Sequence, residues 1–116
     1  MAAPIGPYSP IVRAGDWLIC SGQLGLQDGR MVAGDVTDQA RQAIANIAAL
    51  LESQGAGLTD VAKTTVFLID ISHFAAVNEV YAECFGGHRP ARSAFAVAAL
   101  PMGAAVEIEA WAYRPA

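Results

Sequence analysis

Runs of apolar residues predict two short strands in the first third of the chain. Residues 17–21 (Trp-Leu-Ile-Cys-Ser) are mostly apolar, which favours a short buried strand, and Gly22 closes it. A turn over residues 27–29 ends in Asp-Gly and leads into residues 30–32. We expect this second segment to be the partner strand of a hairpin.

A stripe of apolar residues three and four positions apart predicts the first helix. We expect Asp35, Thr37 or Asp38 to cap its start, and Gly55 and Gly57 to end it, because glycine adopts the left-handed turn that follows many helices. The stripe consists of Ala40, Ile44, Ile47 and Leu51.

A second helix is predicted by the same spacing further along the chain. Ser72 is its expected N-cap, and the pair Gly86 and Gly87 is its expected end. Its apolar side comprises Phe74, Val77, Val80, Tyr81, Cys84 and Phe85.

Three segments rich in β-branched or alternating residues predict the remaining strands, over residues 62–70, 92–97 and 105–113. The resulting order is strand, strand, helix, strand, helix, strand, strand, without a linker or repeat. We therefore predict one domain over residues 1–116, an α+β fold with two helices packed on one face of a sheet.

Both faces of this predicted sheet carry apolar side chains. In the last strand, Val106, Ile108 and Ala110 point to one face, while Trp111 and Tyr113 point to the other. Two helices cover one face, and no segment remains to cover the second. We expect a homo-oligomer that buries the second face between subunits. The alternative is a small apolar patch left in water.

Charge and composition narrow the class of protein. The net charge is −4 and Lys63 is the only lysine, so the chain lacks the clustered basic face that binds nucleic acid. No apolar run approaches the roughly 20 residues of a membrane span, and the first four residues do not resemble a signal peptide. Cys20 and Cys84 fit reduced thiols. We expect a cytoplasmic protein with neither nucleic-acid nor membrane partners.

Motifs for metals and common cofactors are missing from the sequence. His73 and His88 are too far from each other and from the cysteines for a zinc-binding spacing. The chain has no phosphate-binding loop, dinucleotide fingerprint or serine-hydrolase elbow. We therefore expect no metal and no cofactor, and by elimination acid–base chemistry on a small anion.

Arg92 is the first candidate for binding that anion. It enters a predicted buried strand, where a guanidinium needs a matched anion to offset the loss of water. Its planar fork also binds a carboxylate through two hydrogen bonds. Two explanations remain open, an internal salt bridge or a site for an anionic ligand.

Glu107 and Glu109 are candidates for proton transfer. They lie two residues apart on a strand and therefore on one face, where neighbouring carboxylates raise the pKa of at least one of the two. A raised pKa suits a proton donor or acceptor near neutral pH. The alternative is that one of them pairs with Arg92 and has no other role.

Three residues near the start of the chain could line a site. Tyr8 lies between Pro7 and Pro10, in an extended segment that could present its phenol at a subunit edge. Ser21 offers a hydroxyl, and Gly22 lets a ligand approach the backbone closely. The alternative for Tyr8 is a packing role with its hydroxyl in water.

Six segments together, in this order and spacing, closely resemble the RidA family, also called YjgF. The likeness spans almost the whole chain, and the Pro-Ala-Arg-Ser and Val-Glu-Ile-Glu segments taken jointly are specific to the family. The segments are Ile5-Gly6-Pro7-Tyr8, Ser21-Gly22-Gln23, Lys63-Thr64-Thr65-Val66-Phe67, Val77-Asn78-Glu79-Val80-Tyr81, Pro90-Ala91-Arg92-Ser93 and Val106-Glu107-Ile108-Glu109-Ala110.

The resemblance implies a chorismate-mutase-like mixed sheet with two helices on one face, assembled as a homotrimer with clefts between subunits. It implies a cofactor-free deaminase that hydrolyses 2-imino and enamino acids, such as 2-iminopropanoate and 2-iminobutanoate, to 2-keto acids and ammonia. Arg92 would bind the substrate carboxylate, and Glu107 would transfer protons through a water or activate that water. Tyr8 would close the cleft, and Ser21, Gly22 and Asn78 would line it.

Two departures from the family pattern bear on the substrate. Ala94 stands where many members have a cysteine, and it could replace that residue if the backbone amide is what matters. Residues 85–90 form a shorter segment than in the best-known imine deaminases and look more like the aminoacrylate deaminases of pyrimidine breakdown. A non-catalytic member that binds carboxylate ligands, or acts as a holdase, is the remaining alternative.

Overall fold

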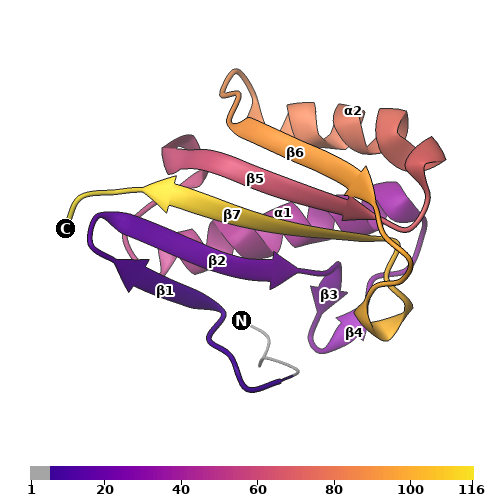
Figure 1. Ribbon diagram of the computed structural model, residues 1–116, viewed down its shortest axis with the longest axis horizontal. Helices are drawn as coiled ribbons and strands as arrows, with labels where there is room; N and C mark the ends of the chain where they lie inside the picture. The colour runs from indigo at the N-terminus through magenta and orange to yellow at the C-terminus, as the bar shows by residue number, and fades with distance from the viewer. Residues whose placement is uncertain (1–5) are drawn as a thin grey trace.

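Five strands form one mixed sheet in the order β1-β2-β7-β5-β6, as the computed structural model of residues 6–116 shows (Figure 1). Only β5 and β6 run parallel to each other. A parallel pair needs a long crossover, which α2 (Phe74–Phe85) provides. The strands are β1 (Ile11–Ala14), β2 (Trp17–Gln23), β5 (Val61–Leu68), β6 (Ala91–Ala96) and β7 (Val106–Tyr113).

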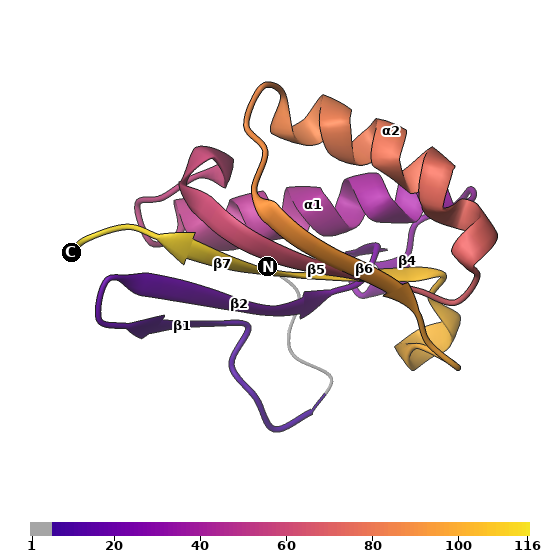
Figure 2. The ribbon, with the colours of Figure 1, turned by 45° about the horizontal axis from the view of Figure 1, so that its top comes forward.

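The two helices, α1 (Val36–Glu52) and α2, pack side by side on the same face of the sheet (Figure 2). This arrangement confirms the predicted α+β fold. The core between helices and sheet is apolar, and its largest fully buried side chains include Leu18, Ile44, Ile47, Leu51, Leu68 and Ile108.

The start of α1 follows from its sequence. The Asp35 carboxylate accepts hydrogen bonds from the backbone N–H groups of Thr37 and Asp38, and the Asp38 carboxylate accepts one from the N–H of Asp35. This reciprocal pair satisfies N–H groups that have no partner within the helix. Asp35 is therefore the N-cap among the three predicted candidates, and Gly55 with φ of 76° follows the helix end.

The predicted N-cap of α2 is wrong. Ser72 lies inside a 3₁₀ turn, η2 (Ile71–His73), and its backbone N–H donates to the carboxylate of Asp70. Because Asp70 caps this turn, α2 itself begins after His73 without a side-chain cap. The predicted end is confirmed, since Gly86 terminates α2 with φ of 61°.

The hairpins also differ from the prediction. Residues 17–21 belong to β2, whose hairpin partner is β1, a short strand that the sequence analysis missed. The predicted turn at Asp28 and Gly29 exists, but it joins β3 (Leu26–Gln27) to β4 (Arg30–Met31) in a separate two-stranded sheet. Two further 3₁₀ turns are η1 (Leu58–Asp60) and η3 (Pro101–Gly103).

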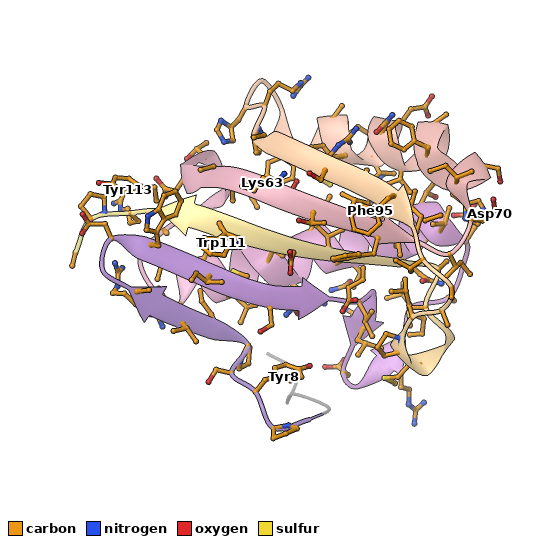
Figure 3. The ribbon with its side chains drawn as sticks, viewed as in Figure 1. Tyr8, Lys63, Asp70, Phe95, Trp111 and Tyr113 are labelled. Carbon is orange, nitrogen blue, oxygen red and sulfur yellow. The ribbon has the colours of Figure 1, made fainter. Side chains whose placement is uncertain are left out.

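The face of the sheet away from the helices, here called the open face, carries several half-exposed aromatic side chains. Phe95, Trp111 and Tyr113 are 45, 42 and 48% exposed, and all three lie on the near side of the sheet in Figure 3. The Phe95 ring meets that of Phe67 edge-on at 5.3 Å. Lys63 lies on the same face, where its Nζ donates to the Ser93 hydroxyl over 2.7 Å. The sheet is thus apolar on both faces, as predicted.

Across residues 6–116, neither helix has the length and apolar character that crossing a membrane requires.

Candidate active site

Arg92 extends from β6 toward α2, and three side chains of that helix surround its guanidinium. Its Nη1 donates a hydrogen bond to Oδ1 of Asn78 over 2.7 Å. Its Cζ lies 5.3 Å from the ring centre of Phe74 and 4.9 Å from that of Tyr81. These three residues are four and three positions apart, so they form one stripe along α2. We call this arrangement the arginine slot.

The ring of Tyr81 is held in turn by a residue of the sheet. Its hydroxyl is 2.7 Å from the hydroxyl of Thr64, which lies directly opposite Arg92 in the β5–β6 ladder and is fully buried. Burial raises the pKa of the Tyr81 phenol, although the hydrogen bond to Thr64 and the charge of Arg92 oppose the shift. Tyr81 is therefore a neutral hydroxyl near pH 7.

An internal salt bridge does not account for Arg92. Within the described part of the chain, ion pairs join Arg41 to Glu83 and Arg114 to Asp60, and neither involves Arg92. The guanidinium is half-buried, and its one hydrogen-bonded partner there is the neutral carboxamide of Asn78. This arrangement leaves the positive charge available for an anionic ligand.

Glu107 lies on the open face, where it packs against the backbone of β2. A Cβ atom built on Gly22 would lie only 2.6 Å from its Oε2 and 2.8 Å from its Cδ. Burial, and secondarily the Glu109 carboxylate, raises the pKa of Glu107. The sequence predicted mutual repulsion of the two glutamates, and the structure adds burial as the larger cause.

Ser21 binds the segment before β1 that carries Tyr8. The Ser21 hydroxyl donates to the carbonyl oxygen of Ser9 over 2.7 Å. The backbone N–H of Ser21 donates to the carbonyl oxygen of Pro10. These bonds hold the segment that carries Tyr8 against β2. Tyr8 itself is 46% exposed at the edge of the molecule (Figure 3). Ile5 of the same motif lies outside the described residues.

The register of the sheet divides the predicted site residues into two groups. Arg92 pairs with Thr64, and Thr64 with Ala110, so all three side chains point toward the helices. Glu107 pairs with Phe67, which in turn pairs with Phe95, on the open face. Within one chain, Arg92 and Glu107 therefore lie on opposite faces of the sheet with β5 between their strands.

The remaining predicted residues follow the same division. Ala94 lies two residues after Arg92 on the helix side, and its methyl group packs against the core. Asn78 belongs to the arginine slot, while Gly22 contacts Glu107 on the other side. Over residues 6–116, no three histidine, cysteine or acidic side chains gather in a group that could hold a metal ion.

The sequence did not indicate the roles of Phe74, Tyr81 and Thr64 in the surroundings of Arg92. The two aromatic residues read as ordinary members of an apolar helix face. A usable signal existed in the spacing, because Asn78 interrupts that face at the position between the two rings. Thr64 gave no such signal, since threonine is common in strands.

The mixed sheet, its two helices and the arginine slot define an α+β domain with a half-buried guanidinium beside α2. A model of the family described as Endoribonuclease L-PSP matches residues 1–114. A RutC family protein of Pyrococcus horikoshii is 50% identical, covering 96% of this chain and 90% of its own. A human 2-iminobutanoate/2-iminopropanoate deaminase is 46% identical, covering 95% and 82%. The chain belongs to this family, also called RidA or YjgF.

Solved structures of relatives have the same fold. The YjgF gene product of E. coli is 44% identical with a TM-score of 0.91, covering 97% of this chain and 91% of its own. E. coli TdcF, crystallised with bound serine, is 41% identical with a TM-score of 0.90, covering 96% and 91%. These matches confirm the YjgF-type architecture that the sequence segments predicted.

Proposed function

We propose that this protein is a cofactor-free deaminase that hydrolyses small 2-imino and enamino acids to 2-keto acids and ammonia. The observation that carries the proposal is Arg92, a half-buried cation held by a neutral slot and without a carboxylate partner among residues 6–116. The names of relatives such as the human deaminase support the reaction, and the serine bound to TdcF supports a small amino-acid-like ligand.

The chemistry needs few groups. Arg92 binds the substrate carboxylate through paired hydrogen bonds and so fixes the imine carbon in place. The imine nitrogen gains a proton, water adds to the carbon, and the resulting amine leaves as ammonia while a carbonyl forms. Glu107 is the proton-transfer group, acting on the nitrogen through a water or activating the attacking water, and its raised pKa suits either role.

A complete site then requires two copies of the chain. Arg92 and Glu107 lie on opposite faces of one sheet, so an imine cannot contact both within a subunit. We propose a homotrimer in which the slot of one subunit faces Glu107, Gly22 and Ser21 of the next, with Tyr8 closing the cleft. The aromatic open face supports this assembly, because a face of this kind is normally covered.

The activity is tested by trapping imines with semicarbazide. An L-amino-acid oxidase generates imines from several amino acids, and each reaction is run with the protein, with Arg92→Ala and without either. We expect the wild type to lower the trapped imine and Arg92→Ala to behave like the blank. Equal trapping in all three reactions for every amino acid would exclude these imines as substrates.

The shared site is tested by mixing two inactive variants. An equal mixture of Arg92→Ala and Glu107→Gln, unfolded and refolded together, should recover up to about a quarter of wild-type activity, because random assembly pairs an intact Arg92 with an intact Glu107 in that fraction of sites. A site built within one subunit would recover none. Each variant refolded alone is the control.

Two alternatives to this function are each supported by one observation. The short segment before β6, residues 85–90, favours 2-aminoacrylate as the substrate, and it is tested by generating that enamine in the same assay. Ala94 in place of cysteine favours a member that binds keto acids without turnover. Binding of 2-oxobutanoate with no deamination, and activity gained by Ala94→Cys, would identify that case.

A further inference from the structure

We propose that Phe74 and Tyr81 are positioning residues that hold the guanidinium of Arg92 between their rings, and that Thr64 anchors Tyr81 for this purpose. The inference deepens the proposed function, because it states how the carboxylate-binding group is oriented. It rests on the contacts of one arginine with one stripe of α2.

The distances place the guanidinium between the rings rather than beside them. Residues seven apart on a helix are separated by about 10.5 Å along its axis. The two distances from Cζ to the ring centres are 5.3 Å for Phe74 and 4.9 Å for Tyr81. A cation at both distances lies between the two side chains, with Asn78 bonded to it from the turn between them.

This arrangement restricts the orientation of Arg92. The rings attract the cation through their π-faces, and Asn78 takes one hydrogen of Nη1. Within residues 6–116 the guanidinium makes no other side-chain hydrogen bond, so its remaining donors are free for a ligand. A carboxylate binds through two of these donors, in the plane of the fork.

Thr64 explains why the Tyr81 ring stays in place. It is the one fully buried polar side chain of the described core, and its hydroxyl has Tyr81 as its partner. A strand at this position could carry valine without a polar group to satisfy. The hydrogen bond instead ties the ring to β5, directly opposite Arg92 in the ladder.

The mobility of the Arg92 guanidinium tests the inference without any ligand. ¹⁵N relaxation of the Arg92 Nε–H group, assigned by its loss in Arg92→Lys, is measured in the wild type, Tyr81→Leu, Tyr81→Phe and Phe74→Leu. We expect a lower order parameter in both leucine variants and an intermediate value in Tyr81→Phe, which keeps the ring but loses the hydrogen bond to Thr64. Fully native order in Tyr81→Phe would overturn the anchoring role of Thr64. Phe74 is 37% exposed, so Phe74→Leu remains informative if Tyr81→Leu fails to fold. Native order in a folded leucine variant would overturn the inference.

Ligand affinity shows whether the positioning matters for binding. The probe is 2-oxobutanoate, measured by calorimetry with the intact oligomer. We expect Tyr81→Leu to weaken binding by about 3- to 30-fold. The same substitution should change affinity by less than about twofold in an Arg92→Lys background, because an ammonium has no plane to orient.

The two proposals fail in different ways. A wild type that neither binds 2-oxobutanoate nor turns over an imine would contradict the proposed function, while the relaxation data would still decide the positioning role. An equal loss of affinity from Tyr81→Leu in both backgrounds would indicate a general effect on folding, and would overturn positioning through Arg92.

Discussion

Gly22 and Glu107 lie so close that no other residue fits at position 22 without moving the carboxylate, since an added Cβ would be 2.6 Å from Oε2. The atom in the way is the end of a flexible side chain, which can shift at little cost to the fold. The glycine therefore determines where the carboxylate lies rather than whether the protein folds.

Gly22→Ala should lower kcat by at least about tenfold while the melting temperature changes little, because a displacement of about 1 Å can cost 100-fold in rate. The measurement pairs imine hydrolysis with thermal unfolding. Gly57→Ala is the matched control, since its φ of −150° suits alanine and nothing lies within 4 Å of the new methyl group. A wild-type kcat in Gly22→Ala would show that the reaction does not depend on the position of the Glu107 carboxylate.

The face on which Glu107 lies could be predicted from the sequence, whereas its contact with Gly22 could not. Alternation along the last strand placed Glu107 on the face opposite Ile108, and the structure agrees. Its contact with Gly22 could not be predicted, because it depends on an irregularity in the β2–β7 register between Cys20 and Gln23. Local patterns fix which way a side chain points, whereas register fixes what it meets.

The same limit applies to the arginine slot. The apolar stripe of α2 was visible in the sequence, Arg92 was a candidate there, and the order of elements predicted the fold. That Arg92 points to α2 while Glu107 points away follows only from the pairing of β5 with both β6 and β7. The missed strand β1 has only four residues, Ile-Val-Arg-Ala, and this is too short a segment for an alternating pattern to be recognised.

The pH dependence of stability should report the raised pKa of Glu107. A carboxyl group whose pKa is raised on folding favours the folded state below its ordinary value of 4.5, and that contribution is lost as the pH rises through the raised value. Glu107→Gln should therefore match the wild type near pH 4 and be more stable at pH 7. Chemical denaturation across this range is the measurement. A wild type as stable as the variant at pH 7 would contradict the burial of this charge.

Glu107→Gln should lower the catalytic rate, although it should raise stability at pH 7. Glutamine cannot exchange a proton, so we expect kcat to fall by about 10²- to 10⁴-fold with a smaller change in KM. The limb of the pH–rate profile that reports Glu107 should disappear. Glu109→Gln is the control on the same strand, and an equal loss there would point to the pair rather than to Glu107.

Removing the Arg92 side chain should weaken carboxylate binding strongly. Losing one member of a buried charged pair costs about 2–5 kcal/mol of binding free energy, or roughly 30- to 5,000-fold in affinity. Arg92→Ala is compared by calorimetry with Arg30→Ala, which removes the same charge from the exposed β4 hairpin. Native affinity for 2-oxobutanoate in Arg92→Ala would exclude the slot as the binding site.

A charge on the open face should separate the subunits. Trp111→Glu places a carboxylate where a half-exposed indole lies, and burying it against another copy without a partner is unfavourable. We expect a folded monomer by light scattering, with deamination lost because no second copy completes the site. Ile71→Glu makes the same change in the turn before α2 and should leave the assembly intact. A trimeric Trp111→Glu variant would place the interface elsewhere.

Lys63 gives this fold a built-in chemical reporter. It is the chain's one lysine, and it lies on the open face beside Ser93. An amine-reactive reagent therefore has one internal target, distinguishable by peptide mass spectrometry from the amino terminus. In the proposed trimer, the rate of labelling at that single amine would measure how often the open face is uncovered, so subunit exchange could be followed in the unaltered protein without a dye or a tag.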